Sequence, residues 1–147
     1  MPLNVEIVTA ERVVRTEPNV EALVVPGTDG QLTILPSHAA LMTTLTFGEI
    51  IMRRGNDEDV FAVSGGFLEV RRDHVTILAD QAETADDIDE PRADEARRRA
   101  EERLRRYRDQ NVANVDVARA QASLQRALVR LRAAERRRRR PGAPRPG

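Results

Sequence analysis

The clearest structural signal in the chain is the stretch at residues 64–78, SGGFLEVRRDHVTIL. Its two apolar runs, FLEV and VTIL, flank the polar segment 71–74, and this pattern predicts a β-hairpin. The pair Gly65 and Gly66 in front of the hairpin indicates a bend where the backbone needs a positive φ or close packing. We therefore expect an antiparallel sheet built around this hairpin.

The residues upstream repeat the strand pattern. Apolar and polar residues alternate at 3–7, which predicts a half-buried strand, and further apolar runs occur at 21–25 and 32–34. The turn residues at 55–57 separate two more apolar runs and predict another hairpin. Short strands at intervals of roughly 8–12 residues are typical of a sandwich or barrel. We predict an antiparallel β-sandwich over residues 1–85.

Downstream of the sandwich the period of the apolar residues changes to three or four. It holds from about 90 to 108 and again from 117 to 134, with a polar interruption between, so we predict an antiparallel two-helix hairpin over residues 86–135. Asp89 is the expected N-cap of the first helix. Its apolar stripe is narrow and rich in alanine, so the hairpin should be held only weakly. Four favourable i,i+4 ion pairs are expected: Asp94–Arg98, Glu95–Arg99, Glu101–Arg105 and Glu102–Arg106.

Charge divides the chain in the same three parts, although the formal net charge is zero. The net charge is −7 over residues 1–85, +1 over 86–135 and +6 over 136–147, where six arginines stand without an acid. This composition predicts a disordered basic tail at 136–147. The expected fold is therefore α+β, with a β-sandwich, a helical hairpin and a tail.

The residue inventory excludes most catalytic chemistry. The chain has no Cys and no Lys, which removes thiol nucleophiles, disulfides, P-loop lysines and Schiff-base lysines. The two histidines, His38 and His74, are not at metal-ligand spacing. Ser64 lacks the glycine that a nucleophile elbow needs two residues earlier. No apolar run reaches the roughly 20 residues that span a bilayer. We predict a non-catalytic protein without a metal site or a required cofactor.

Taken in order, four segments resemble the epsilon subunit of F-type ATP synthases. The resemblance covers about residues 3–135, and Ser37 and Ala40 stand where that family usually has Gly and Pro. The matching segments are DGQLTILPSHAAL at 29–41, SGGFLEV at 64–70, VTILAD at 75–80 and IDEPRA at 88–93.

The resemblance implies a rotor subunit that transmits torque between proton flow and ATP synthesis. Its partners would be the gamma subunit, the c-ring and the alpha/beta catalytic head. It would lie at the cytoplasmic face of the cell membrane, associated with the membrane only through the complex. The hairpin would either fold onto the sandwich or extend along gamma and block ATP hydrolysis. A weakly held hairpin suits such a two-state element.

Two sets of site residues follow from the resemblance. The c-ring contact would be Asp29, Gln31 and His38, although His38 could instead only tie down its own loop. A non-catalytic regulatory ATP would be held by Glu83, Ile88, Asp89, Arg92, Ala93, Arg126 and Arg130. Arg126 and Arg130 are four residues apart on one helix face, so both could reach one phosphate chain. The alternative is that this pair is merely solvated.

The tail lies beyond the resemblance and has three interpretations. Its first five arginines are Arg136, Arg137, Arg138, Arg139 and Arg140. They are either a solvated end, or a partner for acidic segments of the catalytic subunits that strengthens inhibition, or a contact for anionic lipid.

Two alternative functions remain at this point. One is a nucleic-acid-binding module with a basic helical arm, and the other is a free-standing ATP sensor. The acidic sandwich and the presence of only four aromatic residues argue against nucleic acid as a partner.

Overall fold

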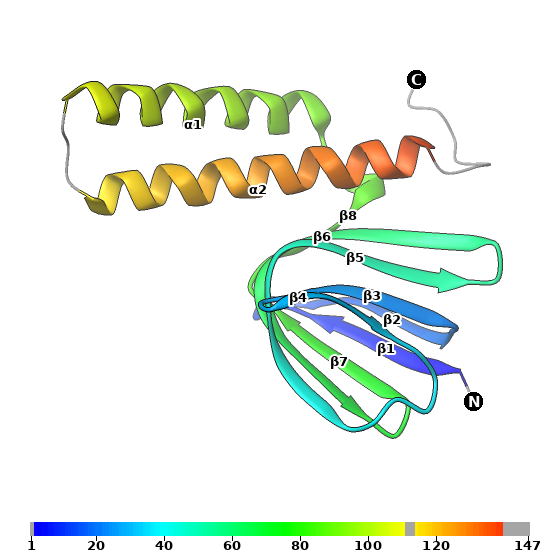
Figure 1. Cartoon of the computed structure of the whole chain (residues 1–147). Helices are drawn as coiled ribbons and strands as arrows, with labels where there is room; N and C mark the ends of the chain where they lie inside the picture. The colour runs from blue at the N-terminus through cyan, green and yellow to red at the C-terminus, as the bar shows by residue number, and fades with distance from the viewer. Residues whose placement is uncertain (1, 111–113, 140–147) are drawn as a thin grey trace.

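The computed structural model describes residues 2–110 and 114–139 (Figure 1). Within these ranges a β-sandwich is followed by a short 3-10 helix and two antiparallel helices, so the predicted α+β fold is confirmed. The elements are β1 (Leu3–Val8), β2 (Val13–Val20), β3 (Ala22–Gly27), β4 (Gly30–Ile34), β5 (Leu41–Arg54), β6 (Asp57–Arg71), β7 (His74–Ala79), β8 (Ala82–Thr84), η1 (Ala85–Asp87), α1 (Glu90–Gln110) and α2 (Asn114–Arg139).

A single ladder of strands folds over to make both layers of the sandwich. Its order is β2-β1-β7-β6-β5-β3-β4, with β8 paired to β6. The pairs are antiparallel except for β1 and β7, which run parallel from the pair Asn4 and His74 onward. The long strands β5 and β6 run through both layers: one half of β5 pairs with β3, and the far half of β6 pairs with β7.

The bend that this folding requires falls at the predicted glycines. Gly65 and Gly66 have φ values of 109° and 138°, which side chains of L residues rarely adopt. A Cβ on Gly66 would stand 2.1 Å from the carbonyl oxygen of Leu78. The sequence-based expectation of a positive φ or close packing is therefore confirmed, and Gly66 has both.

The main core lies between the two layers and follows the predicted alternation. Leu3, Val5 and Ile7 of β1 are buried, while Asn4 and Glu6 between them face solvent. The largest fully buried side chain is Phe61 on β6. Period-2 burial continues along β7, so the hairpin at residues 64–78 forms as predicted.

The helices meet through alanines. Asp89 caps α1, because its Oδ1 accepts a hydrogen bond from the Arg92 backbone N–H at 3.2 Å. Buried alanines then recur every seven residues, or about two turns, which gives each helix one narrow stripe. They are Ala93 and Ala100 on α1, and Ala120, Ala127 and Ala134 on α2.

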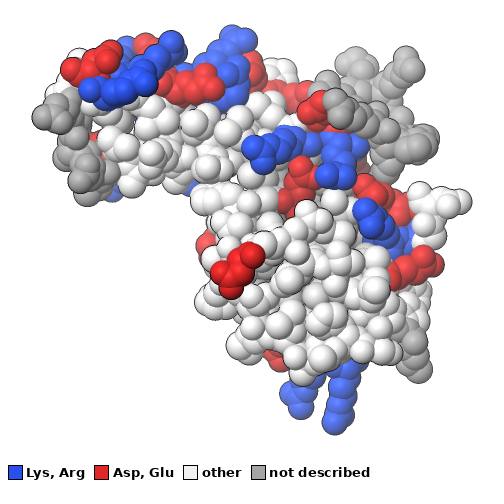
Figure 2. Space-filling view, in the orientation of Figure 1, with Lys and Arg blue, Asp and Glu red and all other residues white. Residues whose placement is uncertain are grey.

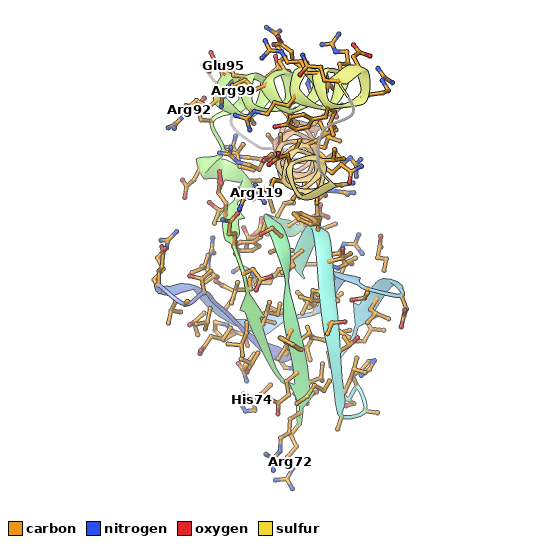
Figure 3. All side chains as sticks on the ribbon, turned by 90° about the vertical axis from the view of Figure 1, so that its left-hand side faces the viewer. Arg72, His74, Arg92, Glu95, Arg99 and Arg119 are labelled. Carbon is orange, nitrogen blue, oxygen red and sulfur yellow. The ribbon has the colours of Figure 1, made fainter. Side chains whose placement is uncertain are left out.

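The second helix connects the hairpin to the sandwich. Figures 1 and 3 show α2 lying between α1 and the sheet. Val129 and Ala133 of α2 join a small apolar cluster with Val24, Ile51, Val60, Ala62 and Ala85. This cluster is much smaller than the main core, so the apolar contribution to docking is modest.

The end of α2 lies further along the chain than the sequence indicated. The helix continues to Arg139, four residues into the segment 136–147 that we expected to be disordered. Arginine is a good helix former, and both Arg136 and Arg137 have carboxylate partners on the sandwich side. Arg140, the rest of the tail, and the side chains of Arg138 and Arg139 lie outside the described residues.

In the part of the chain that the structure describes, neither helix combines the length and the apolar character needed to cross a membrane.

Candidate functional site

A pocket of about 350 Å³ lies where the helices meet the sheet edge. Its walls come from β6, β8, the segment before β8, one residue of α1 and the middle of α2. The volume falls within the range of roughly 300–1,000 Å³ typical of small-ligand sites. Three of the seven residues predicted for a nucleotide line this pocket: Glu83, Arg126 and Arg130.

The two arginines of the pocket differ in their partners. Arg130 makes a two-pronged contact with Glu83, its Nε and Nη2 each donating to one carboxylate oxygen at 3.1 Å. Arg126 donates to the hydroxyl of Ser123, one turn earlier on α2, at 3.1 Å. Both guanidinium groups are thus at one pocket, as their spacing predicted. An anion that enters would have to compete with Glu83 for Arg130.

The other four predicted nucleotide residues are placed around the start of α1 rather than in the pocket wall. Asp89 serves as the helix cap, and Ile88 packs against the small apolar cluster below α2. Arg92 is exposed on the first turn of α1 (Figure 3). Ala93 is fully buried, so its side chain is closed to a ligand in this arrangement.

The predicted c-ring residues lie on two different parts of the sandwich. Asp29 is exposed in the turn between β3 and β4. Gln31 follows on β4 and lines a second groove, of about 300 Å³, whose opposite wall includes Arg132 and Arg136 of α2. His38 lies in the loop between β4 and β5 instead.

The His38 loop is fixed by local hydrogen bonds. The His38 Nδ1 is 2.8 Å from the Ala39 carbonyl oxygen, and the Ser37 N–H donates to Asp73 Oδ1 at 2.6 Å. Asp73 belongs to the β6–β7 turn, and its neighbours Arg72 and His74 mark the end of the sandwich far from the helices (Figure 3). His38 therefore sits near that end, away from the groove that holds Gln31.

The first two tail arginines contact the sandwich side. Arg136 Nε lies 2.5 Å from Glu49 Oε2 on β5, and Arg137 pairs with Asp86 in η1. Figure 2 shows blue and red side chains meeting where α2 rests on the sandwich, while much of the visible sandwich surface is uncharged.

Sequence reasoning missed an exposed apolar row on the sheet. Val13, Leu78 and Phe67 are 54–56% exposed, and the strand register places Val13 opposite Val8, Val8 opposite Leu78 and Leu78 opposite Phe67. Together with Met42 of β5, which is 72% exposed, these residues form what we call the apolar row. The signal was present, because the buried neighbours of Phe67 and Leu78 force both onto the outer face.

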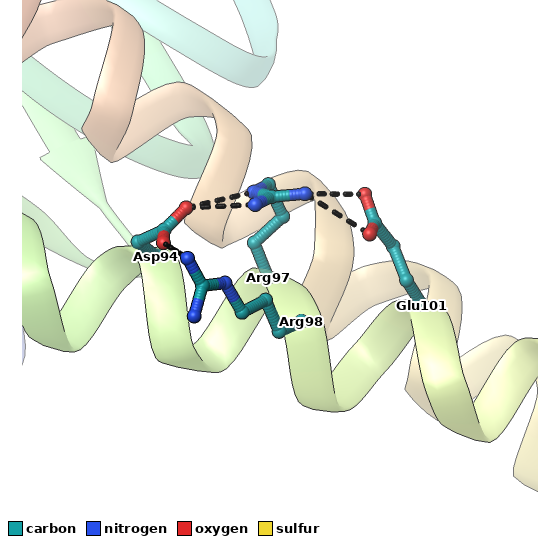
Figure 4. A network of polar contacts seen from close by, with 4 residues as sticks. All are labelled: Asp94, Arg97, Arg98 and Glu101. Atoms are coloured by element: carbon teal, nitrogen blue, oxygen red, sulfur yellow. Dashed lines mark hydrogen bonds and ion pairs between the residues drawn. The ribbon is translucent and has the colours of Figure 1, made fainter.

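A network of ion pairs and hydrogen bonds lies along the surface of α1 (Figure 4). Arg97 binds Asp94 at 2.8 Å and Glu101 at 3.0 Å, and Arg98 binds Asp94 at 2.9 Å. The hydrogen bond from Arg97 lowers the pKa of the Asp94 carboxyl below its usual value. Of the predicted pairs, Asp94–Arg98 and Glu102–Arg106 are confirmed, each at 2.9 Å. Glu101 turns back to Arg97 rather than forward to Arg105.

The described residues do not bring three or more His, Asp or Glu side chains together as a metal site. The fold and the site define a two-part protein, a sandwich with a helical hairpin docked through one helix. This is the class of the ATP synthase delta/epsilon chains: residues 2–85 match the family described as "ATP synthase, Delta/Epsilon chain, beta-sandwich domain", and residues 86–135 match its long alpha-helix domain.

Curated relatives specify the family further. The chain is 50% identical over 139 residues to the ATP synthase epsilon chain of Dehalococcoides mccartyi, which covers 95% of this chain and 96% of the relative. The epsilon chain of Herpetosiphon aurantiacus is 46% identical over 140 residues, with coverage of 95% and 99%. The chain belongs to the epsilon-chain family of ATP synthase, and the resemblance found in the sequence is confirmed.

Solved structures share the fold. A chain in the Euglena gracilis mitochondrial ATP synthase, in a structure that contains OSCP, F1 and the c-ring, superposes with a TM-score of 0.76 at 20% identity. It covers 91% of this chain and 81% of that one. A chain from the central stalk and c-ring of the Tetrahymena thermophila enzyme gives a TM-score of 0.57 at 13% identity.

Proposed function

We propose that this epsilon-family chain is a rotor subunit that couples proton translocation to ATP synthesis and regulates ATP hydrolysis through its hairpin. The sandwich would bind the gamma subunit and the c-ring at the cytoplasmic face of the cell membrane. The observation that carries the proposal is the apolar row. Large exposed apolar side chains on β2, β7, β6 and β5 form a surface that is costly to leave in water, and such surfaces mark sites of protein association. Family membership favours this role over a nucleic-acid-binding module or a free-standing sensor.

The test removes apolar area from the row without adding charge. Phe67→Thr combined with Leu78→Thr keeps good strand formers at both positions and should weaken gamma binding at least about tenfold. The matched control is Leu35→Thr, because Leu35 is 53% exposed but lies outside the row. Binding is measured by titrating gamma with the purified full chain, and circular dichroism checks the fold. Equal gamma affinity in the double variant and the control would contradict the proposal.

The hairpin is the proposed regulatory element. Support comes from its mode of docking: α2 places Val129 and Ala133 on the sheet, and the rest of the contact is largely ionic. A weakly docked element can exchange between two arrangements whose free energies differ by only a few kcal/mol. We propose that the docked arrangement permits ATP hydrolysis and that the extended one reaches the alpha/beta head and inhibits it.

We also propose that the pocket between sheet and hairpin takes a non-catalytic ATP. Arg126 and Arg130 would hold the phosphate chain, so Glu83 would lose its contact with Arg130. After the start of α1 readjusts, four further residues would complete the site: Ile88, Asp89, Arg92 and Ala93. Support comes from the pocket volume and from two cations on one face of α2. Because the pocket spans both parts of the molecule, ATP would favour the docked hairpin through its differential affinity.

A further inference from the structure

The family match ends at residue 135, but α2 does not. Its next two residues are arginines, and both are engaged with the sandwich side of the molecule. Consecutive residues of a helix point about 100° apart, so Arg136 and Arg137 reach partners on different sides of α2. Glu49 belongs to β5 and Asp86 belongs to η1, the segment that joins the sandwich to the hairpin.

A third ion pair continues the same line of contacts. Arg130 is seven residues, or about two turns, before Arg137, so the two arginines lie on one face of α2. Arg130 binds Glu83 of β8, three residues before Asp86. The helix is thus held along β8 and η1 on one side and by Glu49 of β5 on the other.

The degree of exposure indicates how much these pairs contribute. The Glu49 side chain is 16% exposed and that of Arg137 is 19%, whereas Arg136 and Asp86 are about half exposed, at 46% and 57%. Pairs of this kind shift an equilibrium by only about 1.5- to 5-fold each. That is enough to matter here, because the apolar contact of α2 with the sheet relies on Val129 and Ala133.

We propose that Arg136 and Arg137 form an intramolecular clasp that favours the docked hairpin. In the docked state both guanidinium groups are paired with carboxylates of the same chain, and these ion pairs break when the hairpin leaves the sandwich. This is opposite to the sequence-based interpretation in which the tail strengthens inhibition by pairing with the catalytic subunits. The inference deepens the proposed function and rests on the mobile hairpin proposed there.

The experiment measures docking in the isolated full chain. The protein contains no cysteine, so Arg71→Cys on the sandwich and Arg119→Cys on α2, both exposed, accept two spin labels for pulsed distance measurement. In this background Arg136→Gln with Arg137→Gln should raise the ratio of undocked to docked molecules about 2- to 25-fold. The matched control, Arg99→Gln with Arg103→Gln on α1, makes the same charge change and should leave the ratio unaltered. In about 1 M salt, where screening acts over roughly 3 Å, the unmodified ratio should approach that of the clasp variant.

A charge exchange shows whether the Glu49–Arg136 contact itself is responsible. Glu49→Arg and Arg136→Glu should each favour undocking, and their combination should restore docking. Docking that is indifferent to residues 136 and 137, or a control that shifts equally, would overturn the clasp while leaving a mobile hairpin. A hairpin that stays docked in every variant and at every salt concentration would overturn both the clasp and the mobile-hairpin part of the proposed function.

The assembled complex provides the second measurement. If the clasp favours the docked hairpin, Arg136→Gln with Arg137→Gln should inhibit ATP hydrolysis more strongly than the unmodified chain does. Weaker inhibition would overturn the clasp in favour of a contact between these arginines and the catalytic subunits.

Discussion

At the scale of single residues, position 66 shows how the sandwich closes. The backbone of β6 turns there with a positive φ, and the neighbouring strand passes so near that no Cβ fits. Gly30 has a similar φ, 134°, but open space around it. Substitutions at these two glycines therefore distinguish the free-energy cost of an unusual backbone angle from that of a steric clash.

Replacing Gly66 should accordingly be the more damaging change. Gly66→Ala combines backbone strain with a clash against the Leu78 carbonyl and should lower the free energy of unfolding by about 3 kcal/mol or more. Gly30→Ala should cost only about 1 kcal/mol, because strain acts alone. Urea denaturation of the two variants measures the difference. Equal losses would show that the strand β7 moves aside at little cost.

Arg126 provides a residue-scale test of the proposed nucleotide site. Arg126→Ala removes one of the two cations of the pocket and should weaken ATP binding at least about tenfold, because charge-assisted contacts to phosphate are strong. Arg132→Ala is the matched control, since Arg132 is on the same helix but lines the other groove. Calorimetric titration of both variants with ATP, with and without Mg²⁺, measures the effect. Absence of saturable binding in the unmodified chain at millimolar ATP would reject the ATP site and leave the rotor role intact.

At the scale of elements, the two helices differ in what stabilises them. The second helix has the sandwich beneath it, whereas α1 packs chiefly on α2 and carries ion pairs along its own length. The Arg97 contacts hold the Asp94 pKa below its unfolded value. Their contribution is therefore complete above the unfolded pKa of Asp94 and is lost as the pH falls through the lower, folded value.

Because the pKa of Asp94 is lowered in the folded state, we predict that α1 frays in acid before the sandwich does. Amide hydrogen exchange across α1 should speed up as the pH falls below about 4, the ordinary range of Asp, after correction for the intrinsic pH dependence of exchange. In Arg97→Gln the exchange at neutral pH should already be faster, and the additional acid effect should be smaller. Exchange in α1 that has the same pH profile with and without Arg97 would contradict this account.

Sequence patterns predicted the strands that alternate in burial or contain an apolar run, and missed an edge strand that does neither. Strands such as β1 and β7 bury every second residue, and the hairpin cap at Asp89 is a local pattern. The edge strand β2, VVRTEPNV, has only its last residue buried and contains a proline, so its periodicity is hidden. A long-range ion pair of 2.7 Å, from Arg54 of β5 to Glu17, helps to hold it.

The candidate site was predictable to a similar extent. Arg126 and Arg130 are four residues apart on one helix, and this local spacing correctly predicted that both lie at one pocket. The pairing of Arg136 with Glu49 joins residues far apart in sequence, and no local pattern encodes it. Gln31 and His38 are close in sequence but are separated by the end of a strand, so the fold carries them to different surroundings.

At the scale of the whole molecule, the proposed regulation depends on a hairpin that rests on the sandwich through α2 (Figure 1). The contact between Glu49 and Arg136 offers a place to fix the two bodies together. Since the chain has no other thiol, Glu49→Cys with Arg136→Cys can be joined selectively by a short bifunctional thiol reagent.

Fixing the hairpin in the docked state should abolish its inhibition of ATP hydrolysis by the assembled complex. The same protein before cross-linking is the internal control, and it should inhibit at least as strongly as the unmodified chain because one of the two clasp contacts is removed. Steady-state ATPase rates before and after cross-linking measure the change. A rate that stays low after cross-linking would show that inhibition does not require the hairpin to leave the sandwich.

The parallel pairing of β1 with β7 also has a consequence for how the chain is made. Residue 4 lies beside residue 74, so β1 meets that neighbour only after almost the entire sandwich has been synthesised. Contacts so distant in sequence slow folding, because a long loop must close before they form. We expect β1 and β2 to form a local hairpin during translation, before β7 is available to pair with β1. The two helices are synthesised after the sandwich strands, so they meet a domain that has only just closed.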